Sequence, residues 1–401
     1  MERVRTKEAP NDPAGLQASG SVPRTRRRRL PRHVRDPQGF GTFRLTERDC
    51  RALELLHDYR HLVIDHLQIL LDPGRYRRWR ELPAEERERA IAAAEEQLLE
   101  RDPRSEGWDP ERKRREAGMR AFRRFTAGID RKIYDRAAGL FHHGYVARFD
   151  PRDQLMEFRR GSQKDILALD RRGAEVLCAR RSAERGSRVR LSDLPWDRDS
   201  LTRTQDTMLH ELSLSNARVV FEQGANLIPG VTLSEWDQVN CWGEVTCASD
   251  KTFKLYADAY AEVRQNGRVG NLWFEIDNHS EESKVVGGKY HAYWHFLQSR
   301  AYLENYDDPH SVRVLFIVTN KARYGIARSD EDRVRFMLDQ LKGMQPPNDP
   351  KTFAGKAAFW FACERDFDLV EPERVLTAPI WRSINRPEER RCLIQVSESG
   401  S

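Results

Sequence analysis

The chain has 401 residues, of which 39% are hydrophobic and 33% charged, and its formal net charge is +6. This length allows two or three domains with real cores, and the composition excludes a chain that is disordered throughout. No apolar run approaches the roughly 18–20 residues of a membrane helix, and no secretory signal is apparent, so we expect a cytoplasmic protein with no membrane partner. Six cysteines without a Cys-x-x-Cys pair argue against a zinc site or a disulfide framework.

Positive charge is concentrated at the N-terminus. Residues 1–44 hold eleven Lys or Arg and four Asp or Glu, a net of +7, so the rest of the chain carries −1. Few apolar side chains interrupt residues 1–43, which predicts a disordered basic tail. Its arginine run would attract nucleic-acid phosphates, although a merely solubilising tail is the alternative. The candidate contacts in this run are Arg26, Arg27, Arg28 and Arg29.

The first part of residues 44–182 predicts two short helices joined by a tight turn. Thr46 can cap the first helix, whose leucines fall on one face. Asp65 can cap the second helix, and such a pair begins a helix-turn-helix. A Pro-Gly step ends the pattern. The highly charged residues that follow, about 73–128, are interpreted as a solvated helical insertion.

A recognition helix and a wing are expected after this insertion. Apolar residues at 129–143 repeat at three and four, and strand-like runs follow at 145–149 and 165–169. Helix, strand, turn and strand form the second half of a winged helix, with the helix in the major groove of DNA. An ordinary solvated helix face is the alternative. The candidate DNA-contacting bases on this helix are Arg131, Lys132 and Arg136.

The C-terminal part predicts an α/β domain at residues 204–385. A linker is expected before it at 183–203, and a second disordered tail after it at 386–401. An amphipathic helix, three strands, a helix and a buried strand at 312–319 follow one another. The predicted fold class is therefore α+β, an N-terminal winged helix-turn-helix followed by an α/β domain. The three strands are expected at 242–247, 254–263 and 271–277.

Two carboxylates can meet where these strands pair. An Asn-Gly turn at 266–267 lets the strand that carries Asp258 pair with the strand that carries Glu275. Hydrolysis of a phosphodiester requires Mg²⁺ held by hard oxygen ligands, and these two residues are the predicted ligands. The alternate oxygen ligands are Glu211 and Glu244. A lone histidine on an apolar face, His210, is expected to be a hydrogen-bonded core residue.

This order resembles the PD-(D/E)xK nuclease superfamily, whose signature is an Asp on one strand and Glu-x-Lys on the next. Asp258 and Glu275 match, but Asp277 stands where the lysine is expected. Lys289 on the following helix is the predicted replacement, with Lys284 as the alternate catalytic residue. The resemblance implies a restriction-endonuclease-like fold for the C-terminal domain. Solvated strand ends, or a structural ion pair between Asp277 and Lys289, are the alternatives.

Five segments together are similar to the replication-relaxation family: Leu45–Asp49, Gly144–Arg148, Leu209–His210, Phe274–Asp277 and Ala378–Trp381. The resemblance covers residues 44–382. It implies a winged-helix DNA-binding protein of bacterial plasmids and mobile elements, linked to plasmid replication, with double-stranded DNA as its partner. A homodimer or other replication and mobilisation proteins are further expected partners.

We therefore expect a DNA-binding protein that needs no cofactor for binding. Because Glu-x-Asp replaces Glu-x-Lys, its nuclease-like domain is expected to be degenerate. The alternatives are an active endonuclease that uses Mg²⁺ with Asp258, Glu275 and Lys289, and a dimeric transcriptional regulator.

Overall fold

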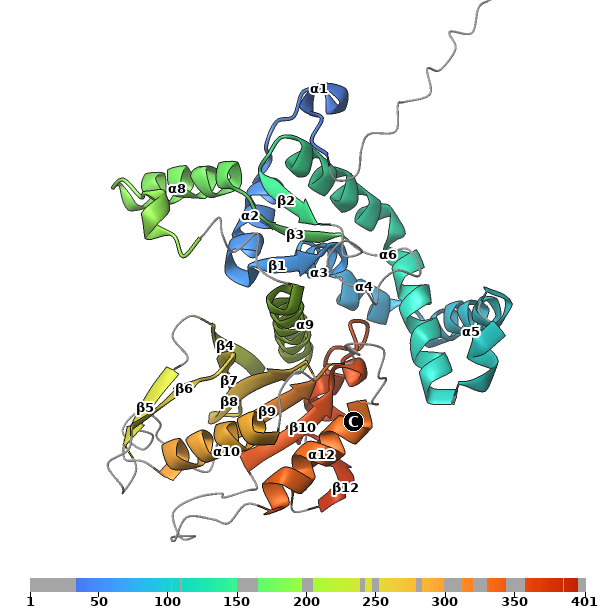
Figure 1. Cartoon of the computed structure of the whole chain (residues 1–401). Coiled ribbons are helices and arrows are strands. Elements are labelled where there is room, and N and C mark those ends of the chain that lie inside the picture. Colours follow the sequence, from blue (N-terminus) through green and yellow to red (C-terminus); the bar gives the residue numbers. More distant parts are fainter. Residues whose placement is uncertain are drawn as a thin grey trace, which may run out of the picture.

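Two units and a helix between them make up the computed structural model, and the fold is mixed α+β, as predicted. In Figure 1 the upper unit is mostly helical, the lower unit is built on a sheet, and helix α9 (Gln205–Leu227) lies between them. The arginine run at 26–29 and most of the predicted tail lie outside the described residues. The structure describes residues 34–101, 103–108, 110–149, 165–196, 205–238, 242–246, 252–278, 283–298, 312–319, 330–343, 358–384 and 386–395.

The N-terminal unit begins with the predicted capped helix. Helix α2 (Glu47–Tyr59) starts after Thr46, whose hydroxyl accepts from the backbone of Asp49 while the Asp49 carboxylate accepts from the backbone of Thr46. This capping box satisfies two amides that the helix itself leaves without partners.

A three-stranded antiparallel sheet of order β1-β3-β2 packs beside this helix. Strand β1 (His61–Val63) stands where a tight turn between two helices was predicted, and it pairs with β3 (Ile166–Leu169). Strand β2 (Val146–Phe149) pairs with the other edge of β3, as the two predicted strands require.

Helix α3 (Ile64–Leu70) follows β1 without a loop. Its N-cap is Val63, which makes no side-chain cap. Asp65 instead pairs with Arg123 at 3.1 Å. The prediction of Asp65 as the cap is wrong, because the strand runs directly into the helix and places residue 65 inside its first turn.

The predicted insertion belongs partly to the core of this unit. Helix α4 (Arg75–Glu81) buries Tyr76 and Trp79, and the ring of Tyr76 stacks on Phe122 with 5.3 Å between centroids. The hydroxyl of Tyr76 also donates to the carbonyl of Leu369 in the C-terminal unit at 2.6 Å. A purely solvated insertion is therefore excluded for this part.

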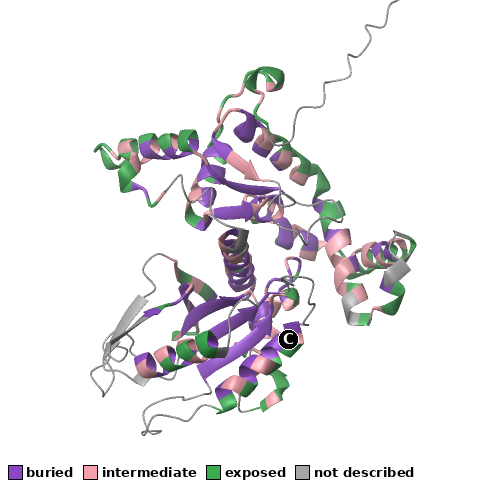
Figure 2. Ribbon diagram, in the orientation of Figure 1, coloured by how far each residue is buried: buried purple, intermediate pink, exposed green. Residues whose placement is uncertain are grey.

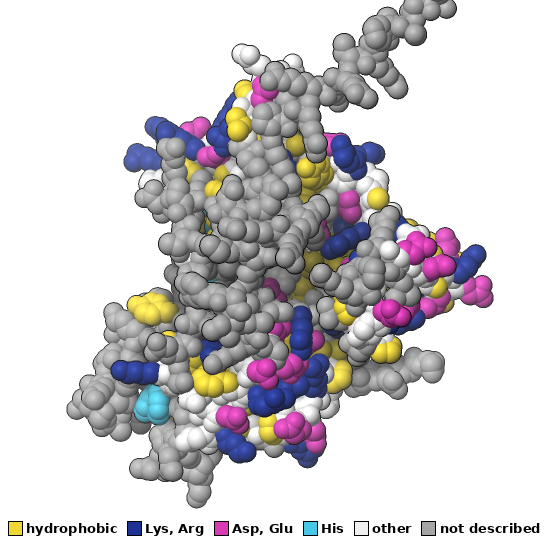
Figure 3. All heavy atoms as spheres, turned by 45° about the vertical axis from the view of Figure 1, so that its right-hand side comes forward, with side chains coloured by type: hydrophobic (Ala, Val, Ile, Leu, Met, Phe, Trp, Pro, Cys, Tyr) yellow, Lys and Arg dark blue, Asp and Glu magenta, His cyan; other side chains and the backbone are white. Residues whose placement is uncertain are grey.

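Helix α6 (Pro110–His142) is continuous through the expected boundary at residue 128. Its first half packs with helix α5 (Ala84–Arg101), and the pair projects from the body of the molecule. Figure 3 shows acidic and basic side chains interspersed on this projection. The predicted start of a separate helix at residue 129 is wrong, since no proline intervenes between the charged and the amphipathic segments and the single Gly128 costs a helix only about 1 kcal/mol.

Some residues expected to be disordered or to form a linker pack on the N-terminal unit. Phe40, at the end of α1 (Pro37–Phe40), stacks on His142 with 5.4 Å between centroids. After helix α8 (Arg171–Arg185), Leu194 is buried and the indole of Trp196 donates to the carbonyl of Leu169 at 3.0 Å. The prediction of a disordered tail is therefore wrong for residues 34–43, and the prediction of a linker is wrong for residues 183–196, because these segments carry apolar side chains that the unit can bury.

The C-terminal unit is a seven-stranded sheet of order β12-β11-β10-β9-β8-β7-β4. Helix α9 packs on one face, and helices α10 (Ser283–Gln298) and α12 (Asp330–Gly343) cover the other. Strands β8, β9 and β10 are mutually parallel and buried, as Figure 2 shows. The strands are β4 (Val231–Asp237), β7 (Ala259–Gln265), β8 (Arg268–Asp277), β9 (Val312–Val318), β10 (Phe359–Cys363), β11 (Trp381–Ser383) and β12 (Arg386–Arg391).

The first strands of this unit differ from the prediction. The expected strand at 254–263 is broken at residues 257–258 into β6 (Thr252–Tyr256) and β7. Strand β6 pairs with β5 (Trp242–Thr246) in a separate two-stranded sheet, and the unpredicted β4 pairs with β7 in the main sheet. The Asn266-Gly267 turn between β7 and β8 is confirmed, with positive φ angles of 50° and 77°.

The end of the chain adds an unpredicted strand. Strand β12 pairs with β11 and lies at the edge of the sheet, so the tail predicted at 386–401 is wrong for residues 386–391. Its Arg390 donates to Glu331 on α12 at 2.7 Å, and Glu331 also accepts from Arg365 and Arg382. Charge pairing thus holds a strand that has little apolar side-chain surface to bury.

Candidate functional site

Asp258 and Glu275 lie side by side on neighbouring strands. Asp258 occupies the bend just before β7, and its backbone amide donates to the carbonyl of Phe274 at 3.0 Å. Its carboxylate oxygen Oδ2 accepts from the amide of Ile276 at 2.7 Å. These two bonds bracket Glu275, so the break in the predicted strand fixes the first carboxylate beside the second.

Helix α10 supplies two donors to the buried carboxylate of Glu275. Lys289 Nζ donates to Oε2 at 2.7 Å, and the hydroxyl of Tyr293 donates to Oε1 at 2.6 Å. The predicted replacement lysine therefore reaches the carboxylate of Glu275, whereas Tyr293 was not anticipated. Burial raises the pKa of Glu275 to about 7, with the charge of Asp258 adding to the rise and Lys289 opposing it.

His210 on α9 is a further member of this cluster. Its Nε2 lies 2.9 Å from Oδ2 of Asp258. Burial opposes ionisation of Asp258, but the hydrogen bond and charge of His210, the charge of Lys289 and the Ile276 amide together hold its pKa below the ordinary value. Burial by itself would lower the pKa of His210. The hydrogen bond and the negative charge of Asp258 outweigh the effect of burial, so the pKa of His210 is raised. A lone histidine 48 residues before the aspartate gives no sequence signal for this contact.

Asp277 is not part of this cluster. Its Oδ2 accepts from Nε of Arg333 on α12 at 2.8 Å, and both side chains are almost fully buried. The alternative of an ion pair between Asp277 and Lys289 is therefore wrong, because Lys289 of α10 reaches Glu275, whereas Asp277, two residues further along β8, is paired with Arg333 of α12. Lys284 is exposed in the first turn of α10.

The alternate oxygen ligands lie elsewhere. Glu211 is hydrogen-bonded to Nδ1 of the buried His61 at 2.5 Å and lies 3.6 Å from Arg60. These two contacts join α9 to the N-terminal unit. Ser215 on the same helix donates to the carbonyl of Tyr59 at 3.0 Å. Glu244 belongs to β5, in the separate sheet, and its side chain lies outside the described residues.

The carboxylates of Asp258 and Glu275 are the type of ligand that a hard cation prefers. Two adjacent carboxylates are ligands that Mg²⁺ uses, and the carboxylate of Asp258 is 19% exposed. Both oxygens of Glu275 already accept from protein donors, so a cation there would share Oε2 with Lys289 or displace it. The ammonium group of Lys289 would then lie close to a negatively charged phosphate bound beside the two carboxylates.

A second group of potential metal ligands is better explained as structural. Glu331, Cys363 and Asp366 have ligand atoms within 4.8 Å of one another. The guanidinium groups around Glu331 oppose the approach of a cation, and burial raises the pKa of the Cys363 thiol to about 12. A thiol that stays protonated is a poor metal ligand.

The candidate DNA-contacting bases on α6 have different surroundings. Arg131 is 73% exposed and pairs with Asp135 on the same helix, and Lys132 is exposed. Arg136 instead donates to Asp49 at 3.0 Å and lies 4.1 Å over the ring of Phe43. Arg136 therefore fastens α6 to the start of α2, and two of the three predicted bases face solvent.

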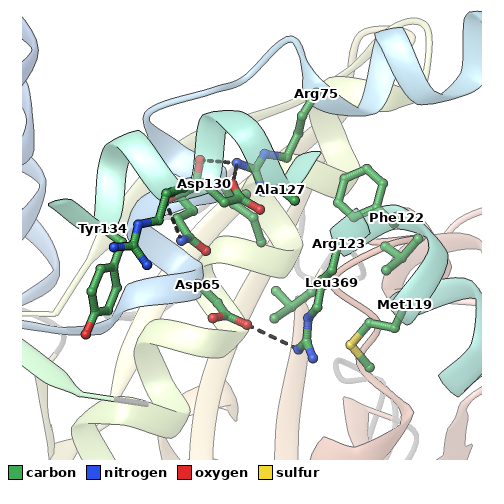
Figure 4. A pocket seen from close by; sticks show the side chains of 13 residues that line it. Asp65, Arg75, Met119, Phe122, Arg123, Ala127, Asp130, Tyr134 and Leu369 are labelled. Carbon is green, nitrogen blue, oxygen red and sulfur yellow. Dashed lines mark hydrogen bonds and ion pairs between the residues drawn. The ribbon is translucent and has the colours of Figure 1, made fainter. Parts of the chain in front are cut away.

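A cavity of about 330 Å³ lies where α3 and α6 meet the C-terminal unit. Figure 4 shows Arg123 reaching Asp65 on one side of it, and Arg75 reaching Asp130 on another. Leu369 of the C-terminal unit completes its apolar lining. The cavity thus marks the seam between the two units.

Residues 117–308 match a family model described as Replication-relaxation. This range contains the exposed bases of α6 and the cluster of His210, Asp258, Glu275 and Lys289. No curated protein and no solved structure matches the chain. Among the described residues, no helix is long and apolar enough to cross a membrane. The match supports the family to which the sequence motifs point, the replication-relaxation family.

Proposed function

We propose that this protein binds double-stranded DNA through a winged helix and acts in the replication of a plasmid or mobile element. The family match over residues 117–308 supports the replication-related role. Apart from α4 and α5, which come between α3 and α6, the element order of the N-terminal unit supports the winged helix: α2, β1, α3, α6, β2 and β3, with sheet order β1-β3-β2. Helix α6 takes the place of the recognition helix, and the β2–β3 pair takes the place of the wing.

The observation that carries this proposal is the exposure of Arg131 and Lys132 on α6, the helix that precedes the β2–β3 pair. Bases on a recognition helix can contact DNA phosphates, and each phosphate neutralised releases counterions. We expect binding of the full chain to a labelled duplex, measured by fluorescence anisotropy, to weaken steeply with salt. The double variant Arg131→Gln/Lys132→Gln should bind about 10-fold more weakly with a shallower salt dependence.

The matched control removes two arginines from the C-terminal unit. Arg335 and Arg386 are 66% and 60% exposed, and each pairs with an acid three residues away. The variant Arg335→Gln/Arg386→Gln should bind DNA like the unmodified protein. Equal losses in both double variants would mean that only net charge matters, and absence of duplex binding at low salt would refute the proposal.

A second candidate function is hydrolysis of phosphodiesters in the C-terminal unit. The contact of 2.7 Å between Lys289 Nζ and Glu275 favours this function. Helix α10 thereby supplies the ammonium group that the expected lysine at position 277 would have supplied. The order α9, then antiparallel β4, β7 and β8, then α10 and the parallel β9, also agrees with a nuclease-like domain. Asp258 and Glu275 would hold Mg²⁺, which supplies Lewis-acid activation of a phosphate or water.

The choice between an active and a degenerate centre can be tested with supercoiled plasmid in Mg²⁺ or Mn²⁺. An active centre predicts nicking that is lost in Asp258→Asn and Lys289→Met. Lys284→Met is the matched control, because Lys284 is exposed on the same helix. Absence of nicking by a protein that still binds duplex DNA would refute the hydrolytic function and leave a binding domain.

A further inference from the structure

The carboxylate centre of the C-terminal unit is open to solvent. Glu275 is its most buried member, with only 2% of its side chain exposed. The side chains of Asp258, His210 and Lys289 are 19%, 31% and 27% exposed. Each carboxylate has a basic partner, His210 for Asp258 and Lys289 for Glu275. A ligand that carries a phosphate can therefore approach this centre from solvent.

Two exposed apolar side chains adjoin the centre. Tyr256 is 65% exposed and stands two residues before Asp258, so the Cα atoms of these residues are at most about 7 Å apart. Val285 is 48% exposed and stands one helical turn before Lys289, on the same face of α10. Among the described residues, only two other large apolar side chains are exposed. Scattered apolar side chains are ordinary on a surface, but two beside one polar centre indicate a surface that a ligand covers.

The backbone at Tyr256 is held by the core of the C-terminal unit. Strand β6 lies beside α10 (Figure 1), and the residues on either side of Tyr256, Leu255 and Ala257, are both buried. Both belong to the hydrophobic cluster that contains Val286 and Tyr290 of α10. Tyr256 is thus exposed between two anchored neighbours. A ring on a fixed backbone loses little further freedom when a planar ligand stacks on it.

We propose that the ring of Tyr256 stacks on an unpaired base, and that the carboxylate centre takes single-stranded DNA. Every base presents a flat face to an aromatic ring, so such stacking tolerates any sequence. A base inside a duplex is covered by its neighbours and cannot be reached in this way. The phosphate that adjoins the stacked base lies beside Lys289, and Val285 adds apolar surface from α10. The inference rests on the second candidate function, in which this centre holds a phosphodiester.

The first test measures binding of the full chain to a labelled oligothymidylate of about 16 nucleotides by fluorescence anisotropy. EDTA prevents cleavage, and about 0.2 M salt weakens contacts with the basic N-terminus. Tyr256→Ala should bind at least about 5-fold more weakly, which corresponds to about 1 kcal/mol for one stacked base. Tyr256→Phe keeps the ring and should bind like the wild type.

Phe125→Ala is the matched control, because Phe125 is also an exposed aromatic residue but lies on α6 in the N-terminal unit. This variant should keep its affinity for the single strand. Both Tyr256 variants should melt like the wild type, since the replaced side chain is exposed. Equal affinities of Tyr256→Ala and the wild type would overturn the inference, and so would a wild-type protein that does not bind the single strand.

The second test locates the base in the unmodified protein. A single strand that contains iodouracil forms a cross-link on irradiation with an aromatic ring stacked on that base, and mass spectrometry identifies the linked residue. We expect the cross-link at Tyr256 with the single strand and not with the same strand in a duplex. Cross-links at other residues only, or an equal yield with the duplex, would overturn the inference.

The failure of each proposed function has a different signature. Arg131→Gln/Lys132→Gln should lose affinity for duplex DNA and keep the cross-link at Tyr256, since the two contacts lie in different units. A wild-type protein that does not bind duplex DNA but forms this cross-link would refute the duplex-binding function alone. A protein that forms the cross-link but does not nick plasmid in Mg²⁺ or Mn²⁺ would refute hydrolysis and leave the single-strand site in place.

Discussion

The buried ion pair between Asp277 and Arg333 decides whether Asp277 is structural or belongs to the carboxylate centre. Nε and Nη2 of Arg333 both lie 2.8 Å from Oδ2 of Asp277, and the side chains are only 6% and 4% exposed. The perturbation is Arg333→Met, which keeps an apolar stem beside Phe336 but leaves the carboxylate without this cation.

The expected cost is about 3–5 kcal/mol, the usual result of removing one partner of a buried pair. Loss of the contact of 4.9 Å between Arg333 and the ring of Phe336 adds roughly 0.5–1 kcal/mol. The double variant Asp277→Leu/Arg333→Met should regain most of this stability, because two apolar side chains of similar volume carry no uncompensated charge.

Urea unfolding followed by circular dichroism measures these changes as shifts of the midpoint at constant slope. Arg335→Met on the same helix is the control, because that arginine is 66% exposed and pairs with a 58% exposed Asp332, so its loss should change stability by less than about 0.5 kcal/mol. If Arg333→Met cost no more than the control, or if the double variant were no more stable than the single one, the structural role of Asp277 would be wrong.

Three further predictions concern carboxylates with other roles. The pKa of Glu275 is raised from 4.5 to about 7, so its ionisation favours the unfolded chain and stability should fall as pH rises through that interval. Glu275→Gln should lack this fall in urea titrations, and parallel curves for both proteins would contradict the assignment. Glu331→Gln should cost about 1–2 kcal/mol after allowance for solvent screening, and should speed amide exchange in β12, because Arg390 loses its ion pair of 2.7 Å and keeps only the longer one of 3.6 Å to Asp366. Unchanged exchange there would show that the strand does not depend on these ion pairs. Glu211→Gln should weaken the link to His61 by roughly 2 kcal/mol and separate the calorimetric unfolding of the two units. A single transition at the original temperature would argue against that link.

Local features of this protein could be predicted from contiguous residues. The cap at Thr46, the Asn266-Gly267 turn and the buried strand β9 all follow from side chains that act on their immediate neighbours. The mixed α+β class followed from the same local patterns. Cap geometry, left-handed turn residues and apolar runs require no knowledge of the rest of the chain.

Features that depend on distant segments were predicted less well. Strand β12 was missed because its stability comes from guanidinium groups that meet Glu331, 59 residues away from Arg390. The boundary at residue 128 was misplaced because charge composition changes there while helix α6 does not end.

The sequence by itself determined which carboxylates and lysines were candidates, since residue type sets what chemistry is available. The tertiary structure decided their use. The pairing of strands places Asp258 beside Glu275, and α10 brings Lys289 to the carboxylate of Glu275. Helix α12 places Arg333, 56 residues later in the chain, against Asp277. Partners of this kind depend on how strands and helices pack, because neither the order of the sheet nor the face that a helix covers is encoded in the spacing of two residues.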